Sequence, residues 1–221
     1  MKPIYAQRGD TVLTHSSSLL GRLIRWGETD PGETNGTWAN HAGVVVEDGW
    51  IVPPENYGYG LVRDAEHFVY DSEGRISPKL AVVVEALGRV RRGPLKLNGI
   101  EVRVFRPIPA YTEEEKQRLV TYANRLVGNR YGWWKLIGFL IKRATGGRVD
   151  PTQLYFIHGR PVCSYLAAWG NEVARATGTV IRIVLGVKTH WPGFGMPPQA
   201  ADPDEMLDFC EAHPEFWDEV K

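Results

Sequence analysis

The order in which strand-like and helix-like segments occur is the feature that most constrains how this chain can fold. In the first half, short apolar runs alternate with Gly, Pro, Asn and Asp, which is typical of strands and turns. In the second half, apolar residues recur at helical spacing. Strands that precede the helices, rather than alternate with them, predict an α+β fold. A length of 221 residues fits one compact domain.

Breakers and caps give the approximate bounds of these segments. Thr112 and Glu115 form a capping box, which predicts a helix from Thr112 to about Val127. We expect strands at 10–13, 80–87 and 101–105, a hairpin of 41–46 with 50–52, helices at 17–26, 133–144 and 163–174, and a helix start near Asp202. Two further segments are interpreted by composition alone: 53–78 as an excursion from the core and 89–96 as a solvated basic loop.

Composition excludes several classes of protein. The 26 basic and 26 acidic side chains cancel, which argues against a nucleic-acid binder. The two cysteines cannot make a disulfide scaffold, and no Cys/His spacing fits zinc, so we expect no metal and no cofactor. The N-terminus lacks a secretory signal, and the most apolar run, 133–141, is about half the ~20 residues of a transmembrane helix. We therefore expect a soluble protein, either cytoplasmic or exported without an N-terminal signal.

Cys163 is the first candidate for chemistry. Gly159 and Pro161 interrupt the preceding structure, and good helix formers follow, so Cys163 should lie in the first turn of a helix. Free amides and the positive end of the helix dipole stabilise a thiolate there, and they could also hold an oxyanion. The alternative is an inert, buried cysteine, or one that is bridged to Cys210.

Two further residues could complete a site with Cys163. His41 begins an apolar strand, where an imidazole could project towards a helix terminus and remove the thiol proton. Glu85 follows three valines, an unusual position for a carboxylate unless it is paired, and it could orient the imidazole. The alternatives are that His41 is a packing residue and that Glu85 pairs with Arg89, Arg91 or Arg92.

The order of these motifs resembles that of a known family. Gly9-Asp10-Thr11-Val12-Leu13, Asn40-His41-Ala42-Gly43, Val83-Val84-Glu85-Ala86 and Val162-Cys163-Ser164-Tyr165 are together similar to the circularly permuted NlpC-type, papain-like cysteine hydrolases, in the YiiX/YebB-like branch. In that group the histidine strand precedes the cysteine helix, as it does here.

The resemblance implies an antiparallel sheet with the nucleophile helix packed against it. It covers a core of about 9–175 in a single domain of 1–221, followed by an acidic C-terminal extension of about 192–221. It further implies that Cys163 is the nucleophile, His41 the base and Glu85 the orienting residue. We expect substrate contacts from Ser164, Trp38 and Tyr131.

The implied activity is cleavage of an amide bond, in a peptidoglycan stem peptide of a bacterial or phage setting. Two alternatives stay open. The same scaffold could hydrolyse or transfer a lipid or ester acyl group, as in the related lecithin:retinol acyltransferase group, although Ser164 and Tyr165 stand where that group has Glu-His. The chain could also be a non-catalytic binding module with the same fold. The sequence does not determine the oligomeric state.

Overall fold

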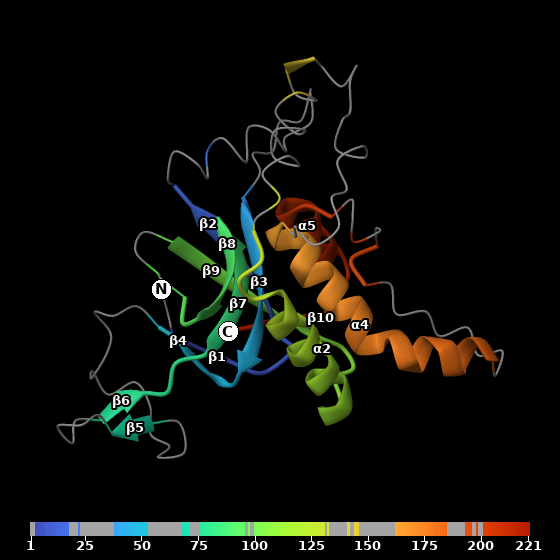
Figure 1. Ribbon diagram of the computed structural model, residues 1–221, viewed down its shortest axis with the longest axis horizontal. Helices are drawn as coiled ribbons and strands as arrows, with labels where there is room; N and C mark the ends of the chain where they lie inside the picture. The colour runs from blue at the N-terminus through green and yellow to red at the C-terminus, as the bar shows by residue number, and fades with distance from the viewer. Residues whose placement is uncertain are drawn as a thin grey trace.

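A six-stranded antiparallel sheet forms the centre of the protein (Figure 1). In the computed structural model the described residues are 3–17, 22, 38–52, 68–70, 76–95, 97, 100–130, 132, 141, 144–145, 162–184, 193–195, 198 and 201–221. The strand order across the sheet is β10-β9-β2-β3-β7-β8. In that order, the strands are Trp217–Val220, Ile100–Pro107, Thr11–Ser16, His41–Glu47, Val82–Leu87 and Arg89–Gly93.

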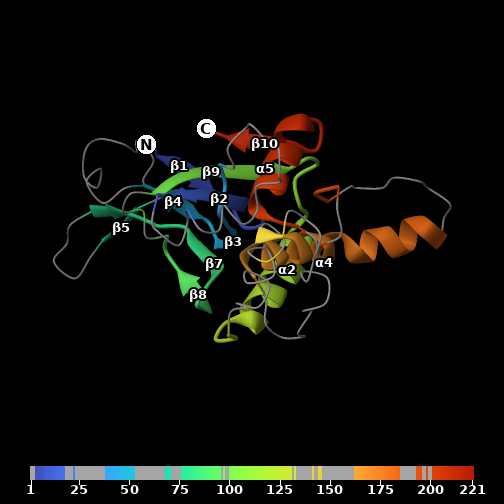
Figure 2. The same ribbon diagram turned by 90° about the horizontal axis from the view of Figure 1, so that it is seen from above.

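Two helices pack together against one face of this sheet. They are α2 (Glu113–Leu126) and α4 (Cys163–Val184), which contact each other and also β3; α4 additionally contacts β7. Figure 2 shows them side by side next to the central strands. A third helix, α5 (Pro203–Ala212), lies beside β10 and α4. Together, sheet and helices make the α+β fold that the order of segments predicts.

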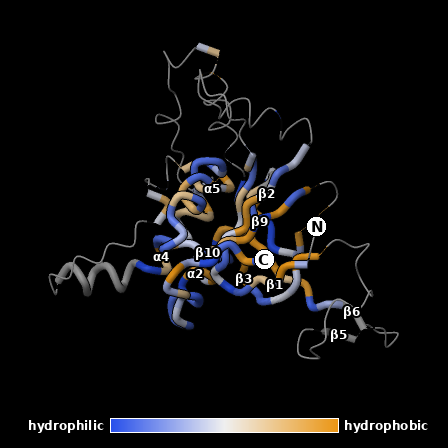
Figure 3. Tube along the Cα trace, turned by 180° about the vertical axis from the view of Figure 1, so that it is seen from behind, coloured by the Kyte–Doolittle hydropathy of each residue, from blue (hydrophilic) through white to orange (hydrophobic). Residues whose placement is uncertain are grey.

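Apolar side chains fill both faces of the sheet. Beneath the helices, the core contains Leu13, Val44, Val84, Leu119 and Leu166. A second cluster on the opposite face is built from alternate positions of the same strands, as the two-residue period of a strand requires. It contains Val12, Val45, Val83 and Val104. Figure 3 shows hydrophobic stretches of the chain gathered among the central strands, near β2 and β9. Strands buried on both faces explain the nearly continuous apolar runs in the sequence.

The predicted hairpin of 41–46 with 50–52 is wrong. β4 (Gly49–Ile51) pairs with β1 (Ile4–Ala6) in a separate two-stranded sheet. β3 has β2 along one edge and β7 along the other, so it has no free edge for a returning strand. The predicted basic loop at 89–96 is also wrong in its first half, because Arg89–Gly93 is the edge strand β8 and pairs with β7.

The acidic C-terminal residues contribute to the sheet and to the core. β10 pairs with β9, and Met206, Leu207, Cys210 and Trp217 belong to the core beneath the helices. The helix start expected near Asp202 is confirmed: Asp202 caps α5, and its carboxylate accepts hydrogen bonds from two backbone amides of the first turn. The sheet is therefore completed by the last strand of the chain.

Other predicted elements have mixed outcomes. The capping box of α2 is confirmed, with both reciprocal bonds between Thr112 and Glu115 present. The predicted helices 17–26 and 133–144 lie almost entirely outside the described residues. Within 53–78, β5 (Phe68–Tyr70) and β6 (Ile76–Pro78) pair with each other in a separate two-stranded sheet. None of the described helices has the length and apolar character needed to cross a membrane.

Candidate active site

Cys163 is the first residue of α4, where the helix meets the sheet. The amide of Leu166 donates to the carbonyl of Val162 at 3.0 Å, which closes the first turn around Cys163. The side chain is buried, with 4% of its surface exposed, and the thiol is free. Cys210 is also free and buried, so the two cysteines do not form a disulfide.

His41, the first residue of β3, lies between the sulfur and a carboxylate. Its Nε2 atom is 2.7 Å from Oε2 of Glu85, and the ring also hydrogen-bonds the Cys163 side chain. Because Nε2 faces Glu85, Nδ1 is the nitrogen left for the sulfur. The strand register explains the contact, since Gly43 lies directly opposite Glu85 and His41 is two residues away on the same strand.

Two backbone amides complete the surroundings of the sulfur. Ala42 on β3 and Ser164 on α4 both donate to Cys163, as does His41. Burial acts to raise the pKa of the thiol, but the charge of the imidazolium and these hydrogen bonds outweigh it and lower the pKa. The amide of Ser164 belongs to the free N-terminal turn that the sequence predicts, whereas the contribution of Ala42 was not predicted.

The imidazole responds in the opposite direction. Burial acts to lower the pKa of His41, but the thiolate of Cys163 and the hydrogen bonds to Cys163 and Glu85 raise it above its usual value. A lowered thiol pKa beside a raised imidazole pKa favours a thiolate–imidazolium pair. A thiolate held this way is a nucleophile, with a proton stored on the neighbouring ring.

Glu85 has two cationic partners. Its Oε2 atom faces His41, and its Oε1 atom accepts from Nε of Arg91 at 2.7 Å and lies 2.6 Å from Nη2 of the same residue. Burial acts to raise the pKa of Glu85, but the bonds to His41 and Arg91 lower it. The two interpretations of Glu85, as a histidine partner and as an arginine partner, therefore describe one arrangement. Arg91 lies directly opposite Glu85 on β8, so the strand register selects it from the three arginines that the sequence offers.

The three expected substrate-contacting residues differ in their surroundings. Ser164 is buried, and it contacts Cys163 through its backbone amide. Trp38 is partly buried three residues before His41; its ring lies beside that of His15 and beneath the guanidinium of Arg103. Tyr131 lies outside the described residues.

The segment that leads into His41 is anchored by the C-terminal helix. Oδ1 of Asp204 on α5 accepts from the amide of Trp38 at 2.7 Å and from the amide of Ala39 at 3.1 Å. Next along the chain, the side chain of Asn40 forms hydrogen bonds with both backbone groups of Ser16 on β2. Asp204 is thus a supporting residue of the site that comes from the acidic segment, and no local sequence pattern identifies it.

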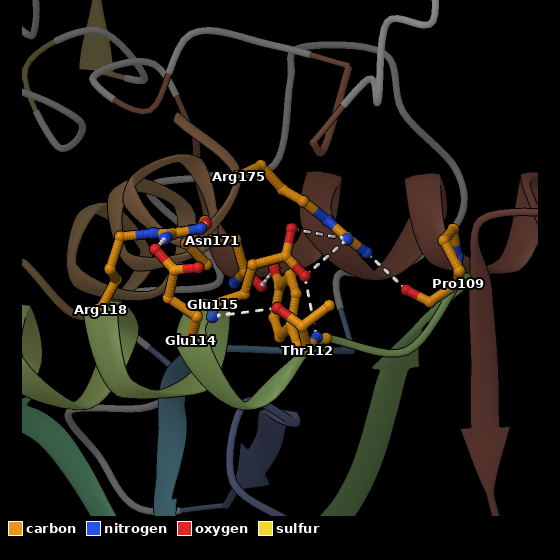
Figure 4. A network of polar contacts seen from close by, with 9 residues as sticks. Pro109, Thr112, Glu114, Glu115, Arg118, Asn171 and Arg175 are labelled. Carbon is orange, nitrogen blue, oxygen red and sulfur yellow. Dashed lines mark hydrogen bonds and ion pairs between the residues drawn. The ribbon is translucent and has the colours of Figure 1, made fainter. Parts of the chain in front are cut away.

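Polar contacts fix α4 against α2 (Figure 4). Nη1 of Arg175 contacts both carboxylate oxygens of Glu115, at 3.0 and 3.1 Å. In the other direction, Arg118 on α2 donates through Nε and Nη2 to the carbonyl of Ala174. Because Cys163 begins α4, these bonds restrict the axial position of the helix that carries the sulfur.

A buried chain of hydrogen bonds connects α4 to β2. The hydroxyl of Tyr111 donates to Oδ1 of Asn171 at 2.5 Å, and Nδ2 of Asn171 donates to Thr11 at 3.1 Å. Buried polar groups are stable only when they are paired, so this chain selects one orientation of the helix on the sheet. In the described part of the chain, no group of three or more His, Cys, Asp or Glu side chains is placed to hold a metal ion.

Comparisons with known proteins give distant structural likenesses only. No family model matches the chain, and no curated protein matches it. Among solved structures, it is similar to the crystal structure of the metalloprotein yiiX from Escherichia coli O157:H7, with a TM-score of 0.41 and 19% identity. The match covers 77% of this chain and 67% of that one. A likeness at this level carries no argument about activity.

Proposed function

We propose that this protein is a cysteine hydrolase that cleaves an amide bond through a thioacyl intermediate. Cys163 is the nucleophile, His41 the general base and acid, and Glu85 the residue that orients the imidazole. The observation that carries the proposal is the arrangement of the Cys163 thiol, the His41 ring and the Glu85 carboxylate in one continuous set of contacts. A cysteine that is merely buried has no need of an ionised partner.

Each step follows from these contacts. The thiolate of Cys163 attacks the carbonyl carbon, and the π electrons move onto the oxygen. In this proposal the amide of Cys163, at the N-terminus of α4, donates to that oxygen. His41 then gives its proton to the leaving amine as the C–N bond breaks, which leaves a thioester. A water molecule, deprotonated by His41, hydrolyses the thioester, and this step releases the acid and restores the thiolate–imidazolium pair.

The two pKa shifts determine the expected pH dependence. As the pH falls through the lowered pKa of Cys163, the thiolate is protonated and activity is lost. As the pH rises through the raised pKa of His41, the ring loses the proton that the leaving group needs. Activity should therefore be a broad bell between those two values.

The order of the motifs is similar to that of the permuted NlpC-type, papain-like enzymes, and it supports a peptidoglycan stem peptide as the substrate. The test is digestion of purified cell wall, with mass analysis of the released peptides and phospholipid vesicles as a parallel substrate. We expect release of peptides by the natural protein and at least about a hundredfold less by Cys163→Ala and by His41→Ala. Equal release by the Cys163→Ala variant would refute the proposal. Release of fatty acid from the vesicles, without release of peptides from the cell wall, would indicate that the substrate is a lipid acyl group.

A further inference from the structure

The carboxylate of Glu85 is shared between two cations on neighbouring strands. Oε2 contacts His41 from β3, while Oε1 contacts two nitrogens of Arg91 from β8, at 2.7 and 2.6 Å. The Glu85 side chain is 7% exposed, whereas that of Arg91 is 39% exposed and reaches the carboxylate from the edge of the sheet. Among the described residues, the hydrogen-bond partners of the sulfur are His41, Ala42 and Ser164, so Arg91 acts on the sulfur through its contact with Glu85 and through its charge.

Counting charges shows why a fourth group is required. A thiolate, an imidazolium and a carboxylate together carry a net charge of −1 in a buried site. Burying an unbalanced charge is unfavourable unless an opposite charge is near. The guanidinium of Arg91 supplies that charge, and the four groups together become neutral.

We propose that Arg91 is a positioning residue of the site: it neutralises and fixes the Glu85 carboxylate, so that Glu85 can hold His41 without disfavouring the thiolate of Cys163. This inference rests on the proposed function. It assigns to Arg91 a role that its neighbours on β8 cannot fill. Arg92 pairs with Glu47, and Arg89 donates to the carbonyl of Gly128.

The charged groups around these four residues are engaged elsewhere. On β2, the ring of His15 donates through Nδ1 to the carbonyl of Trp38, at 2.6 Å. On α2, which packs against β3, the charged side chains form pairs with other partners: Glu113 with Lys116 and Arg8, Glu114 with Arg118, and Glu115 with Arg175. Among the described residues, the charged or titratable side chains that interact with one another at the site are Cys163 from α4, His41 from β3, Glu85 from β7 and Arg91 from β8.

The charge balance predicts shifts of opposite sign. Removing the positive charge in Arg91→Gln makes the site more negative, which disfavours the thiolate and raises the pKa of the Cys163 thiol. Removing the negative charge in Glu85→Gln lowers that pKa. Since Arg91 is partly exposed and separated from the sulfur by two side chains, solvent screening limits the shift in Arg91→Gln to roughly 0.5–1 pH unit. The double variant, Glu85→Gln with Arg91→Gln, should return close to the natural value.

The experiment measures the rate of iodoacetamide modification of Cys163 as a function of pH, with peptide mass spectrometry to separate Cys163 from Cys210. Arg91→Lys keeps the charge and should restore the natural profile. Arg92→Gln is the matched control, because it removes an equally exposed arginine from the same strand, and its profile should not move. An Arg91→Gln profile that coincides with the natural one, or an equal shift in Arg92→Gln, would overturn the role of Arg91.

A second comparison of variants tests the role of Arg91 independently of Arg91→Gln alone. If Arg91→Gln does not fold, the double variant is compared with Glu85→Gln alone, where loss of Arg91 should again raise the thiol pKa; equal values refute the inference. Failure of the proposed function has a different signature, because Cys163 of the natural protein would then titrate as an ordinary thiol. If the pKa of the Cys163 thiol is low but does not change in Arg91→Gln, only the role of Arg91 is refuted and the proposed function is not.

Discussion

Replacing Gly43 by alanine should damage both the sheet and the candidate site. Gly43 is directly opposite Glu85, and a Cβ atom added there would lie 2.8 Å from Cγ1 of Val83 and 3.1 Å from the carbonyl oxygen of Val84. Carbon atoms in contact normally stay about 3.5–4.0 Å apart, so β3 and β7 must separate or Val83 must leave its rotamer. Val83 is fully buried and β-branched, which leaves it little freedom to adjust.

Over-packing of this kind lowers the free energy of unfolding by about 1–3 kcal/mol. In a chain of this length, that corresponds to a fall in Tm of roughly 3–10 °C. The matched control is Gly93→Ala on β8, where no described atom lies within 4 Å of the added Cβ and Tm should stay within roughly a degree of the natural value. Calorimetry measures the Tm of both variants.

Separation of β3 from β7 would also move Glu85 away from His41 and slow the alkylation of Cys163. If the Gly43→Ala protein has the same Tm as the Gly93→Ala control, the packing argument is refuted.

Two more substitutions test the supports of the site. Asp204→Ala removes the acceptor of the Trp38 and Ala39 amides, so denaturant unfolding should show a free energy of unfolding lower by about 1–3 kcal/mol. Alkylation of Cys163 should also be slower. If the free energy of unfolding and the alkylation rate are both unchanged, the anchoring role is contradicted. Tyr111→Phe keeps the ring but leaves Oδ1 of Asn171 buried without its donor, so we expect a loss of about 1–3 kcal/mol with no change in the pH at which the thiol titrates. If the variant is as stable as the natural protein, the hydrogen bond between Tyr111 and Asn171 does not contribute to stability as predicted.

Local signals predicted much of the fold. The reciprocal side-chain bonds of Thr112 and Glu115 depend on only four consecutive residues, so the start of α2 could be predicted from the sequence. The start of α5 at Asp202 was equally local, since an acidic cap next to a proline favours that position. For Cys163, the breakers before it and the helix formers after it were enough to place it in a first turn.

Pairing between distant strands could not be predicted in the same way. The sequence around Trp50 suggests a hairpin because the turn is short, but β3 already has a neighbour on each edge. β10 was missed because Trp217–Val220 is a short, acidic segment whose partner, β9, is about a hundred residues away. The same limit applies to the site, because the sequence gives Arg89, Arg91 and Arg92 as possible partners of Glu85, and only the register of β7 and β8 selects Arg91. Sequence patterns report the period of a strand, whereas register is decided by packing.

The central claim is that contact with His41 makes Cys163 a thiolate at mildly acidic pH. The most direct measurement is the rate of iodoacetamide modification of Cys163 at pH 6, in the natural protein and in His41→Ala, with the buried Cys210 as an internal reference. The account predicts that Cys163 reacts at least about tenfold faster in the natural protein than in His41→Ala, and that Cys210, whose pKa burial raises, stays unmodified in both. Equal rates for Cys163 in the two proteins would contradict it.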